Sequence, residues 1–533
     1  MTTSLPSNAV PDPDQAAGTA AAPPSYTHRQ ILQILSGLLV AMFVSNVAGT
    51  IVGNALPVIT AKLGSTQSQY TWIVTATLLS STASTPIWGK LADLYNKKNL
   101  LLIGLGVFIV GSAAAGAAGS TDFLIAARAF QGIGLGAMMA LVQAIMGSVI
   151  PPRQRGRYMA YTGATVAIAT VVGPLVGGFI VDQSWLGWRW CFWSAVPFAL
   201  IAMAILQLRL QTPTLRRGPA KVDWLGASLV TVAVSDLLIW LSFADKSFPY
   251  ASWQTAVMLG TTVIATVLFI LVEAKAAQPI LPLPIICQRT TALAILASIA
   301  VGIGMFGSSV FLGQYYQIAR GYSPTTAGLM MVPMMAGVLI SSVFIGRWVS
   351  RLGQWKPFVL AGAIILTVGF GLMATIGHST PLWLIGLYSA VAGLGLGMTM
   401  QNLVLAVQNN VSVRDVGAAS AAVTFFRSLG GTIGIQILGT VYANQVTTLT
   451  RTRLASLQLP ASPASNASDS LSLDLSRLPA PVAAAVRSSY GDAIGLLFLI
   501  AAAVCALSII CVVFMRPTKL RNSFNLDNAA SGR

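Results

Sequence analysis

The stretch "QGIGLGAMM" (residues 131–139) returns in the second part of the chain as "AGLGLGMTM" (392–400). The two copies stand 261 residues apart, and each carries three glycines at alternate positions. The same offset aligns four further pairs, namely Arg153 with Arg414, Gly156 with Gly417, Gly173 with Gly434 and Gly178 with Gly439. Seven identities at one offset predict two structurally similar halves within a single chain.

The composition assigns both halves to a membrane. The 533 residues are 55% hydrophobic and 8% charged, and their mean hydropathy is +0.75. Soluble domains carry about 25% charged residues. Continuous apolar runs, without the alternation of a transmembrane strand, predict helices rather than a barrel. Fourteen such runs lie near 33–57, 70–89, 99–118, 123–149, 158–181, 191–210, 223–243, 253–272, 292–316, 324–346, 357–377, 382–408, 417–442 and 491–515.

The basic residues predict an orientation. With fourteen helices, 21 of the 31 Lys and Arg residues fall on the side that holds both ends of the chain, and eight on the other. Positive loops stay in the cytoplasm, so we expect both termini there, in a multi-pass protein of the plasma membrane. This topology, with the attraction of basic loops to anionic lipid headgroups, explains the net charge of +17. We therefore expect no nucleic-acid partner.

These patterns together predict an all-α integral membrane protein with 14 transmembrane helices. We expect two pseudo-symmetric six-helix bundles with two inserted helices between them. The predicted segments are a disordered cytoplasmic tail (1–30), the first bundle (31–210), the inserted pair with its linkers (211–291), the second bundle (292–515, with a long extracytoplasmic loop at 443–489) and a cytoplasmic tail (516–533). Two similar halves favour a transporter whose substrate site lies between them.

A charged turn joins the second and third predicted helices. It reads "GKLADLYNKK" (89–98), and "GRWVSRLGQWK" (346–356) is its counterpart in the second half. Gly89 would let two helix ends approach, Asp93 could accept hydrogen bonds from a neighbouring helix end, and Lys97 and Lys98 would hold the loop inside. Taken alone, the stretch is equally compatible with an ordinary positive turn.

The chain resembles the major facilitator superfamily, specifically its fourteen-helix drug:proton antiporter branch. The motifs that carry the resemblance are "GKLADLYNKK", "LIAARAFQGIG" (124–134), "GATVAIATVVGPLVGG" (163–178), "WLGWRWCF" (185–192), "VDWLG" (222–226) and "FFRSLGGTIG" (425–434). The resemblance implies that Asp93 gates the transporter by contacting the helix at 417–442 or the helix at 158–181. In this chain Leu94 and Asn96 replace a usual basic residue and glycine, so the loop is a weakened example.

The glycine-rich stretch 163–178 implies export. In the resembled family this pattern forms a tight seal between the two halves. Small residues allow close backbone contact, and a proline bends the helix by removing one hydrogen bond. The residues expected in this seal are Gly163, Gly173, Pro174, Gly177 and Gly178.

Three ionisable residues within the predicted helices are candidates for proton coupling, because charges are costly in a membrane. Arg128 resembles an arginine linked to proton transfer in the family, although it could instead extend toward the outer headgroups. Arg427 is too deep for that and is expected to face inward, with a partner. Asp236 could exchange protons or be a locally paired carboxylate. The family's usual acid on the first helix is absent, because Ala48 stands in its place.

The expected substrate cavity is largely apolar with a few polar groups, a combination suited to bulky hydrophobic ligands. The residues expected to line it are Asn46, Thr50, Asn54, Gln314, Tyr315, Gln401 and Asn402, together with Arg128 and Arg427. We therefore expect a monomeric, proton-dependent exporter of hydrophobic or amphipathic small molecules such as drugs and antibiotics. Dedicated export of one endogenous metabolite is the alternative, and a membrane receptor or scaffold is disfavoured. No enzyme motif, cofactor or metal site is expected.

Overall fold

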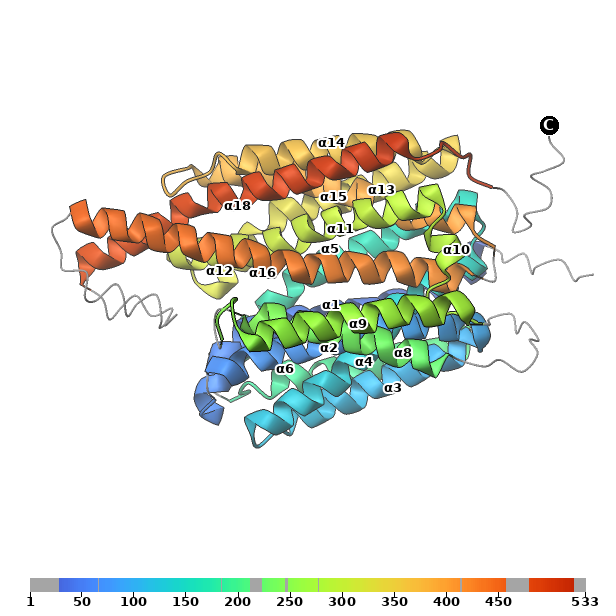
Figure 1. Cartoon of the computed structure of the whole chain (residues 1–533), viewed down its shortest axis with the longest axis horizontal. Helices are drawn as coiled ribbons and strands as arrows, with labels where there is room; N and C mark the ends of the chain where they lie inside the picture. The colour runs from blue at the N-terminus through green and yellow to red at the C-terminus, as the bar shows by residue number, and fades with distance from the viewer. Residues whose placement is uncertain are drawn as a thin grey trace, which may run out of the picture.

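The computed structural model describes residues 28–521, except for 66, 184, 211–222, 245–247, 277, 413–414 and 457–478. The described part consists of helices (Figure 1). The first half contains α1 (His28–Leu63), α2 (Gln67–Leu94), α3 (Lys97–Gly116), α4 (Thr121–Val149), α5 (Pro152–Asp182), α6 (Trp190–Trp193) and α7 (Ala195–Arg209). A short break at Ser194 separates α6 and α7, so this helix of the first half is divided in two.

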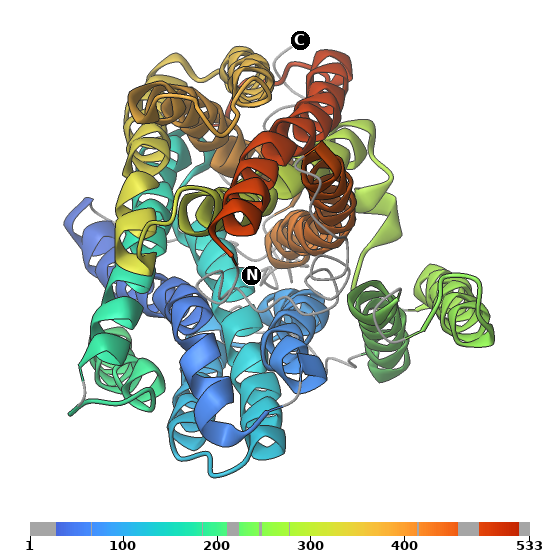
Figure 2. The ribbon, with the colours of Figure 1, turned by 90° about the vertical axis from the view of Figure 1, so that its left-hand side faces the viewer.

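The second half begins with α11 (Arg289–Gln314), which continues into the π-helical turn η2 (Tyr315–Ala319). It is completed by α12 (Pro324–Met330), α13 (Val332–Leu352), α14 (Lys356–Met373), α15 (Leu382–Asn410), α16 (Val416–Ser456) and α18 (Ala480–Phe514). Between the halves lie α8 (Trp224–Phe243), α9 (Trp253–Lys275) and the short α10 (Leu283–Ile286). Seen along the bundle, α8 and α9 lie on its periphery (Figure 2).

The repeated glycines pack in the same way in both halves. A Cβ at Gly132 would meet Thr77 of α2, and a Cβ at its counterpart Gly393 would meet Met334 of α13. Likewise, Gly134 lies against the backbone of α3, and Gly395 lies against that of α14. Helices α2, α3 and α4 therefore correspond to α13, α14 and α15, and the internal repeat is a repeat of helix packing.

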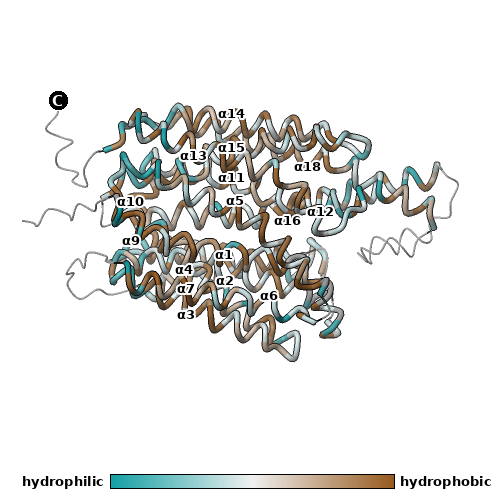
Figure 3. The backbone as a smooth tube through the Cα atoms, turned by 180° about the vertical axis from the view of Figure 1, so that it is seen from behind, coloured by the Kyte–Doolittle hydropathy of each residue, from teal (hydrophilic) through white to brown (hydrophobic). Residues whose placement is uncertain are grey.

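The hydrophobic residues form a belt across the middle of the bundle, with hydrophilic residues gathered toward its ends (Figure 3). Among the described residues, thirteen helical segments are long and apolar enough to cross a membrane.

The predicted run 70–89 lies in α2, a long helix that is not apolar enough to meet this criterion. Its serines and threonines bond to preceding carbonyls of α2 itself, as Ser80, Ser81 and Thr85 do. Because α2 packs closely along α4, it is shielded by protein and needs less apolar surface.

We call the end of the bundle where α2 and α4 finish and α16 begins the basal face, and the opposite end the far face. The helix α18 also ends at the basal face (right in Figure 1). At this face every residue of α16 from Val416 to Phe425 is buried, and so is every residue of α15 from Gly395 to Asn409. A helix buried on all sides is surrounded by protein, so the two halves are closed against each other at the basal face.

The structure corrects the loop expected at 443–489. Helix α16 continues to Ser456, and α18 begins at Ala480, so both ends of that segment are helical; residues 457–478 lie outside the described part. The two helices form an arm beyond the far face (Figure 1). Leu454 packs with Val482, Ala485 and Val486, and Arg453 forms an ion pair with Asp492. These contacts stabilise helical structure where the Ser- and Pro-rich composition suggested a loop.

Candidate functional site: the contacts between the two halves

The first basal contact joins α2 to the beginning of α16. The buried Asp93 carboxylate accepts hydrogen bonds from the backbone N–H groups of Gly417 (2.9 Å) and Ala418 (2.7 Å). These N–H groups lie in the first turn of α16, where a helix offers unpaired donors and a positive dipole end. Gly89, one turn earlier, lies directly against Ala421, so a Cβ at Gly89 would overlap that side chain. Of the two helices that the resemblance names for Asp93, the structure places it against the one at 417–442.

The second basal contact joins α13 to the beginning of α5. The Ser350 hydroxyl accepts a hydrogen bond from the backbone N–H of Arg157 (2.8 Å). Beside it, a Cβ at Gly156 would stand 2.7 Å from the carbonyl oxygen of Gly346. The two backbones therefore touch without an intervening side chain, as glycines allow.

The two basal contacts are pseudo-symmetric equivalents. Under the repeat offsets of 261 and 257 residues, the second contact maps onto the first position by position, with Gly156 on Gly417, Arg157 on Ala418, Gly346 on Gly89 and Ser350 on Asp93. In both, a side-chain oxygen near the end of one helix accepts from backbone N–H near the beginning of a helix from the other half: two first-turn N–H groups of α16 for Asp93, and one N–H in the second turn of α5 for Ser350. The difference is charge, because a carboxylate occupies one position and a hydroxyl the other.

A chain of buried amides lies between the two basal contacts. Gln143 of α4 donates from Nε2 to Oε1 of Gln401 on α15 (3.2 Å). Nearer the basal face, Arg155 of α5 donates to Oε1 of Gln408 (3.3 Å), and Gln408 in turn donates to Ser420 (2.8 Å). Arg155 is 1% exposed and also binds the carbonyls of Ile150 and Gly147. These contacts bridge the halves with polar groups, and opening the basal face would require breaking them.

The glycines of α5 face two different partners. A Cβ at Gly163 would stand 2.6 Å from the Ser342 hydroxyl of α13, and a Cβ at Gly178 would stand 2.9 Å from Thr325 of α12. Both neighbours belong to the second half. By contrast, Gly173 and Gly177 lie against Thr50 and Ile51 of α1, within the first half.

The expected seal is therefore wrong in part. Gly173 and Gly177 bring α5 onto α1, and only the glycines at other turns of α5 reach the second half. The face of a helix turns by 100° with each residue, so one stretch can serve two neighbours. Pro174 lies within α5, and its side chain is outside the described part.

Lys98, at the end of the turn 89–98, contacts the first half. Helix α3 begins at Lys97, and Lys98 donates from Nζ to the carbonyl of Gln207 in α7 (2.6 Å). The Asn96 side chain accepts from the backbone N–H of Lys98 and Asn99, and so caps α3. Asparagine is among the best capping residues. The departure from the family pattern at Asn96 thus supplies a helix cap.

The two intramembrane arginines are both buried. Arg128 is 3% exposed, donates to Oε1 of Gln131 (2.6 Å) and lies 5.8 Å from the ring centre of Phe192. It does not extend to the outer headgroups. Arg427 is 6% exposed and donates to the Met400 carbonyl (3.2 Å). Neither forms an ion pair with an acid among the described residues, and the partner that the structure gives Arg427 is a backbone carbonyl.

Asp236 lies within the inserted pair. Its Oδ2 accepts a hydrogen bond from the Thr262 hydroxyl of α9 (3.1 Å), and its side chain is half-buried. The carboxylate therefore has a local polar partner, away from the contacts between the halves.

The residues expected to line the cavity are only partly brought together. Gln401 lies at the contact between the halves, about 3.9 Å from the Cβ position of Gly163. Asn46 and Asn402 donate to carbonyls one turn back on their own helices, and Thr50 does the same. Gln314 is exposed at the end of α11, and Asn54 has a side chain outside the described part.

Tyr315 is the residue of this group that the structure places elsewhere. It is fully buried in η2, donates to the Gly377 carbonyl (2.9 Å) and accepts from Arg320. It therefore fastens the α14–α15 connection near the far face and does not join the other residues.

Sequence reasoning missed Gln143, Arg155, Ser350 and Gln408. In the sequence, Arg155 is one of several basic residues of a predicted cytoplasmic loop. The sequence also gives no partner for a glutamine within an apolar helix. Ser350 was the one detectable case, because the repeat aligns it with Asp93.

Comparison with known proteins agrees with this architecture. Residues 38–435 match the family model of the Major Facilitator Superfamily. The chain belongs to the major facilitator superfamily. It is 38% identical to the multidrug transporter protein MdtP of Bacillus subtilis over 408 residues, which cover 76% of this chain and 74% of that protein. It is 31% identical to the efflux pump dotC of Dothistroma septosporum, covering 91% of this chain and 83% of that one.

Solved structures of the superfamily share the fold. The proton:xylose symporter XylE aligns with a TM-score of 0.62 at 13% identity, covering 95% of this chain and 100% of that chain. The human organic anion transporter MFSD10 aligns with a TM-score of 0.59 at 14% identity, covering 90% and 99%. The chain is thus a multi-pass membrane transporter and not an enzyme. In this family frame the contacts of α5 with α13 and of α2 with α16 join its two halves.

Proposed function

We propose that this member of the major facilitator superfamily exports hydrophobic and amphipathic small molecules from the cell by alternating access. The observation that carries the proposal is the pair of equivalent basal contacts, in which helix ends of opposite halves meet through glycines and a few hydrogen bonds. Such contacts form and separate without rearranging the interior of either half. The names of relatives that cover most of the chain, a multidrug transporter and an efflux pump, support outward transport of drug-like compounds.

In this proposal the basal face is cytoplasmic and the protein lies in the plasma membrane, as the distribution of basic residues predicts. The structure described here then has its cytoplasmic side closed. Substrate would enter when the two basal contacts separate, and would leave toward the far face once they form again.

Protons are the proposed driving ion. With Ala48 at the position of the usual acid, coupling would rest on other groups, of which Arg128, Asp236 and Arg427 are the candidates within the membrane. The two arginines lie in the separate halves and carry buried charge without a carboxylate partner among the described residues. An incoming substrate that offers a hydrogen-bond acceptor would therefore meet two guanidinium groups that no carboxylate among the described residues holds.

The test is dye retention in an efflux-deficient bacterial host that expresses the chain. We expect lower retention of several chemically unrelated hydrophobic dyes than in cells with empty vector, and recovery of retention when a protonophore collapses the gradient. Resistance to a single chemical class would favour the alternative, dedicated export of one metabolite. Retention equal to the vector control across the panel would refute drug export, and efflux that persists under the protonophore would refute proton coupling.

A further inference from the structure

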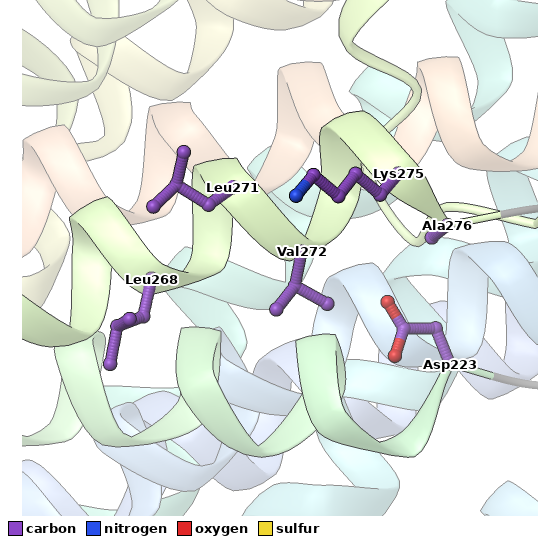
Figure 4. A pocket seen from close by; sticks show the side chains of 6 residues that line it. All are labelled: Asp223, Leu268, Leu271, Val272, Lys275 and Ala276. Atoms are coloured by element: carbon purple, nitrogen blue, oxygen red, sulfur yellow. The ribbon is translucent and has the colours of Figure 1, made fainter.

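A groove of about 390 Å³ lies between the basal ends of α8 and α9, outside the two halves. It is lined by Asp223, Leu268, Leu271, Val272, Lys275 and Ala276 (Figure 4). The acid comes from the beginning of α8, and the other five residues come from the last turns of α9 and its end. The groove therefore combines an apolar wall with one group of each charge. Its position is independent of the contacts that carry the proposed function.

Two carboxylates with unused oxygens meet beside this groove. Asp223 uses Oδ1 to cap α8, accepting from Gly226 N–H (2.9 Å), and its buried Oδ2 accepts nothing among the described residues. Glu273, 3% exposed, uses Oε1 to accept from Ile280 and Leu281 N–H, while its buried Oε2 is likewise unused.

The unused Oδ2 of Asp223 and the hydrogen-bonded Oε1 of Glu273 converge over Gly226. A Cβ there would stand 2.5 Å from Asp223 Oδ2 and 3.2 Å from Glu273 Oε1, so the glycine leaves room for both. A buried charged acceptor without a hydrogen bond is costly. Lys90 of α2 acts on Glu273 electrostatically, yet neither unused oxygen accepts a hydrogen bond from it. The site thus calls for a cation that can donate several hydrogen bonds.

The groove lies at the level of lipid headgroups. Helix α8 has 20 residues, about 30 Å at 1.5 Å per residue, which matches the hydrocarbon core of a bilayer. Trp224, which directly follows Asp223, is 65% exposed, and tryptophan concentrates at membrane interfaces. Leu271 of the groove and Ile264 nearby on α9 are 54% and 61% exposed, so this helix faces lipid. A ligand here would come from the bilayer itself.

Lys275 supplies the complementary charge. Its exposed side chain stands on α9 at the rim of the groove, on the other element from Asp223 (Figure 4). An ammonium between the carboxylates and a phosphate at Lys275 would both belong to one zwitterionic headgroup. Leu268, Leu271 and Val272 would then lie along the acyl chains.

We propose that this groove binds a phospholipid whose headgroup carries a primary ammonium, of the phosphatidylethanolamine type. A choline headgroup has no N–H to donate to Asp223 and Glu273. A glycerol headgroup has no cation. A serine headgroup adds a carboxylate that these two acids repel. The proposal assigns the inserted helix pair a lipid site at the edge of the transporter.

The test measures lipid retention by native mass spectrometry of the purified full-length protein. The protein is titrated in detergent with phosphatidylethanolamine, phosphatidylcholine or phosphatidylglycerol of identical acyl chains. We expect the ethanolamine lipid to bind about tenfold more tightly than the choline lipid, the scale of one or two charge-assisted hydrogen bonds. Equal retention of the ethanolamine and choline lipids, or stronger retention of the glycerol lipid, would overturn the proposal.

Two variants locate the site. Asp223→Asn keeps the oxygen that caps Gly226 and removes the charge, so α8 keeps its cap while the preference for ethanolamine falls to the level of choline. Lys275→Gln should weaken all three phospholipids together, because it acts on the phosphate. Asp122→Asn and Arg209→Gln, exposed residues remote from the groove, are the matched controls and should bind as wild type. An ethanolamine preference that survives Asp223→Asn would place the lipid elsewhere.

Discussion

At the scale of single residues, the two basal contacts differ by one functional group. Asp93 and Ser350 occupy equivalent places in the repeat; Asp93 accepts from two first-turn N–H groups of α16, whereas Ser350 accepts from one N–H in the second turn of α5. A carboxylate also interacts with the positive end of the helix dipole, which a hydroxyl does not. We therefore expect the contact between α2 and α16 to hold the basal face closed more strongly than the contact between α13 and α5.

This difference predicts the effect of removing the charge of Asp93 and of removing the hydroxyl of Ser350. Hydrogen bonds to a charged group contribute about 1.5–3 kcal/mol, and neutral ones about 0.5–1.5 kcal/mol. Asp93→Asn should therefore shift the equilibrium toward an open basal face by a larger factor than Ser350→Ala, and should reduce transport more. The measurement is the distance distribution between spin labels on the basal ends of α2 and α16, together with dye efflux. Asp122→Asn, an exposed acid at the far face, is the control; a larger effect of Ser350→Ala would contradict the ranking.

At the scale of helices, small residues determine which neighbours each helix can touch. Helix α5 reaches α13 of the other half through Gly156 and Gly163, and α1 of its own half through Gly173 and Gly177. One glycine-rich helix thus contributes both to the interior of its own half and to the contact with α13 of the other half. The sequence pattern predicts a single seal for these glycines. Which turn of α5 faces which neighbour depends on how the helices are placed in space, and the sequence does not contain that information.

A larger side chain at the contact between α5 and α13 should hold the basal face open. In Gly156→Val the new side chain would collide with the carbonyl oxygen of Gly346, which stands 2.7 Å from the Cβ position. Backbone cannot move aside as a flexible side chain can, so we expect loss of dye efflux while the protein still inserts and is produced. Gly260→Val on α9, where a Cβ has nothing within 4 Å, controls for adding a β-branched residue to a helix. Normal efflux by Gly156→Val would show that this contact need not form during transport.

At the scale of the whole molecule, the proposal requires that the basal face be cytoplasmic. The chain offers a natural reporter, because Cys287 is an exposed cysteine in the connection between α10 and α11 at the basal face. Cys191 and Cys505 are buried, and Cys511 is partly buried.

A membrane-impermeant maleimide should therefore label the protein in inside-out vesicles and leave it unlabelled in intact cells. Cys287→Ser should abolish the labelling in the vesicles, which assigns the signal to this thiol. Labelling in intact cells that depends on Cys287 would place the basal face outside and would contradict the proposed orientation.

The sequence by itself determined the class of fold, because the length of apolar runs, the asymmetry of basic residues and the glycine repeat are local or periodic properties of the chain. It also predicted Asp93 as a contact residue, since the repeat and the motif mark that position. Only the tertiary structure decided which helices touch. Gln143, Arg155 and Gln408 acquire partners some 250 residues away, because hydrogen bonds between the halves depend on their mutual position. Tyr315 instead bonds within its own half, to the α14–α15 connection, which its position in the sequence does not reveal. The composition of 443–489 predicted a loop, but its ends pair as helices through contacts that no single segment contains.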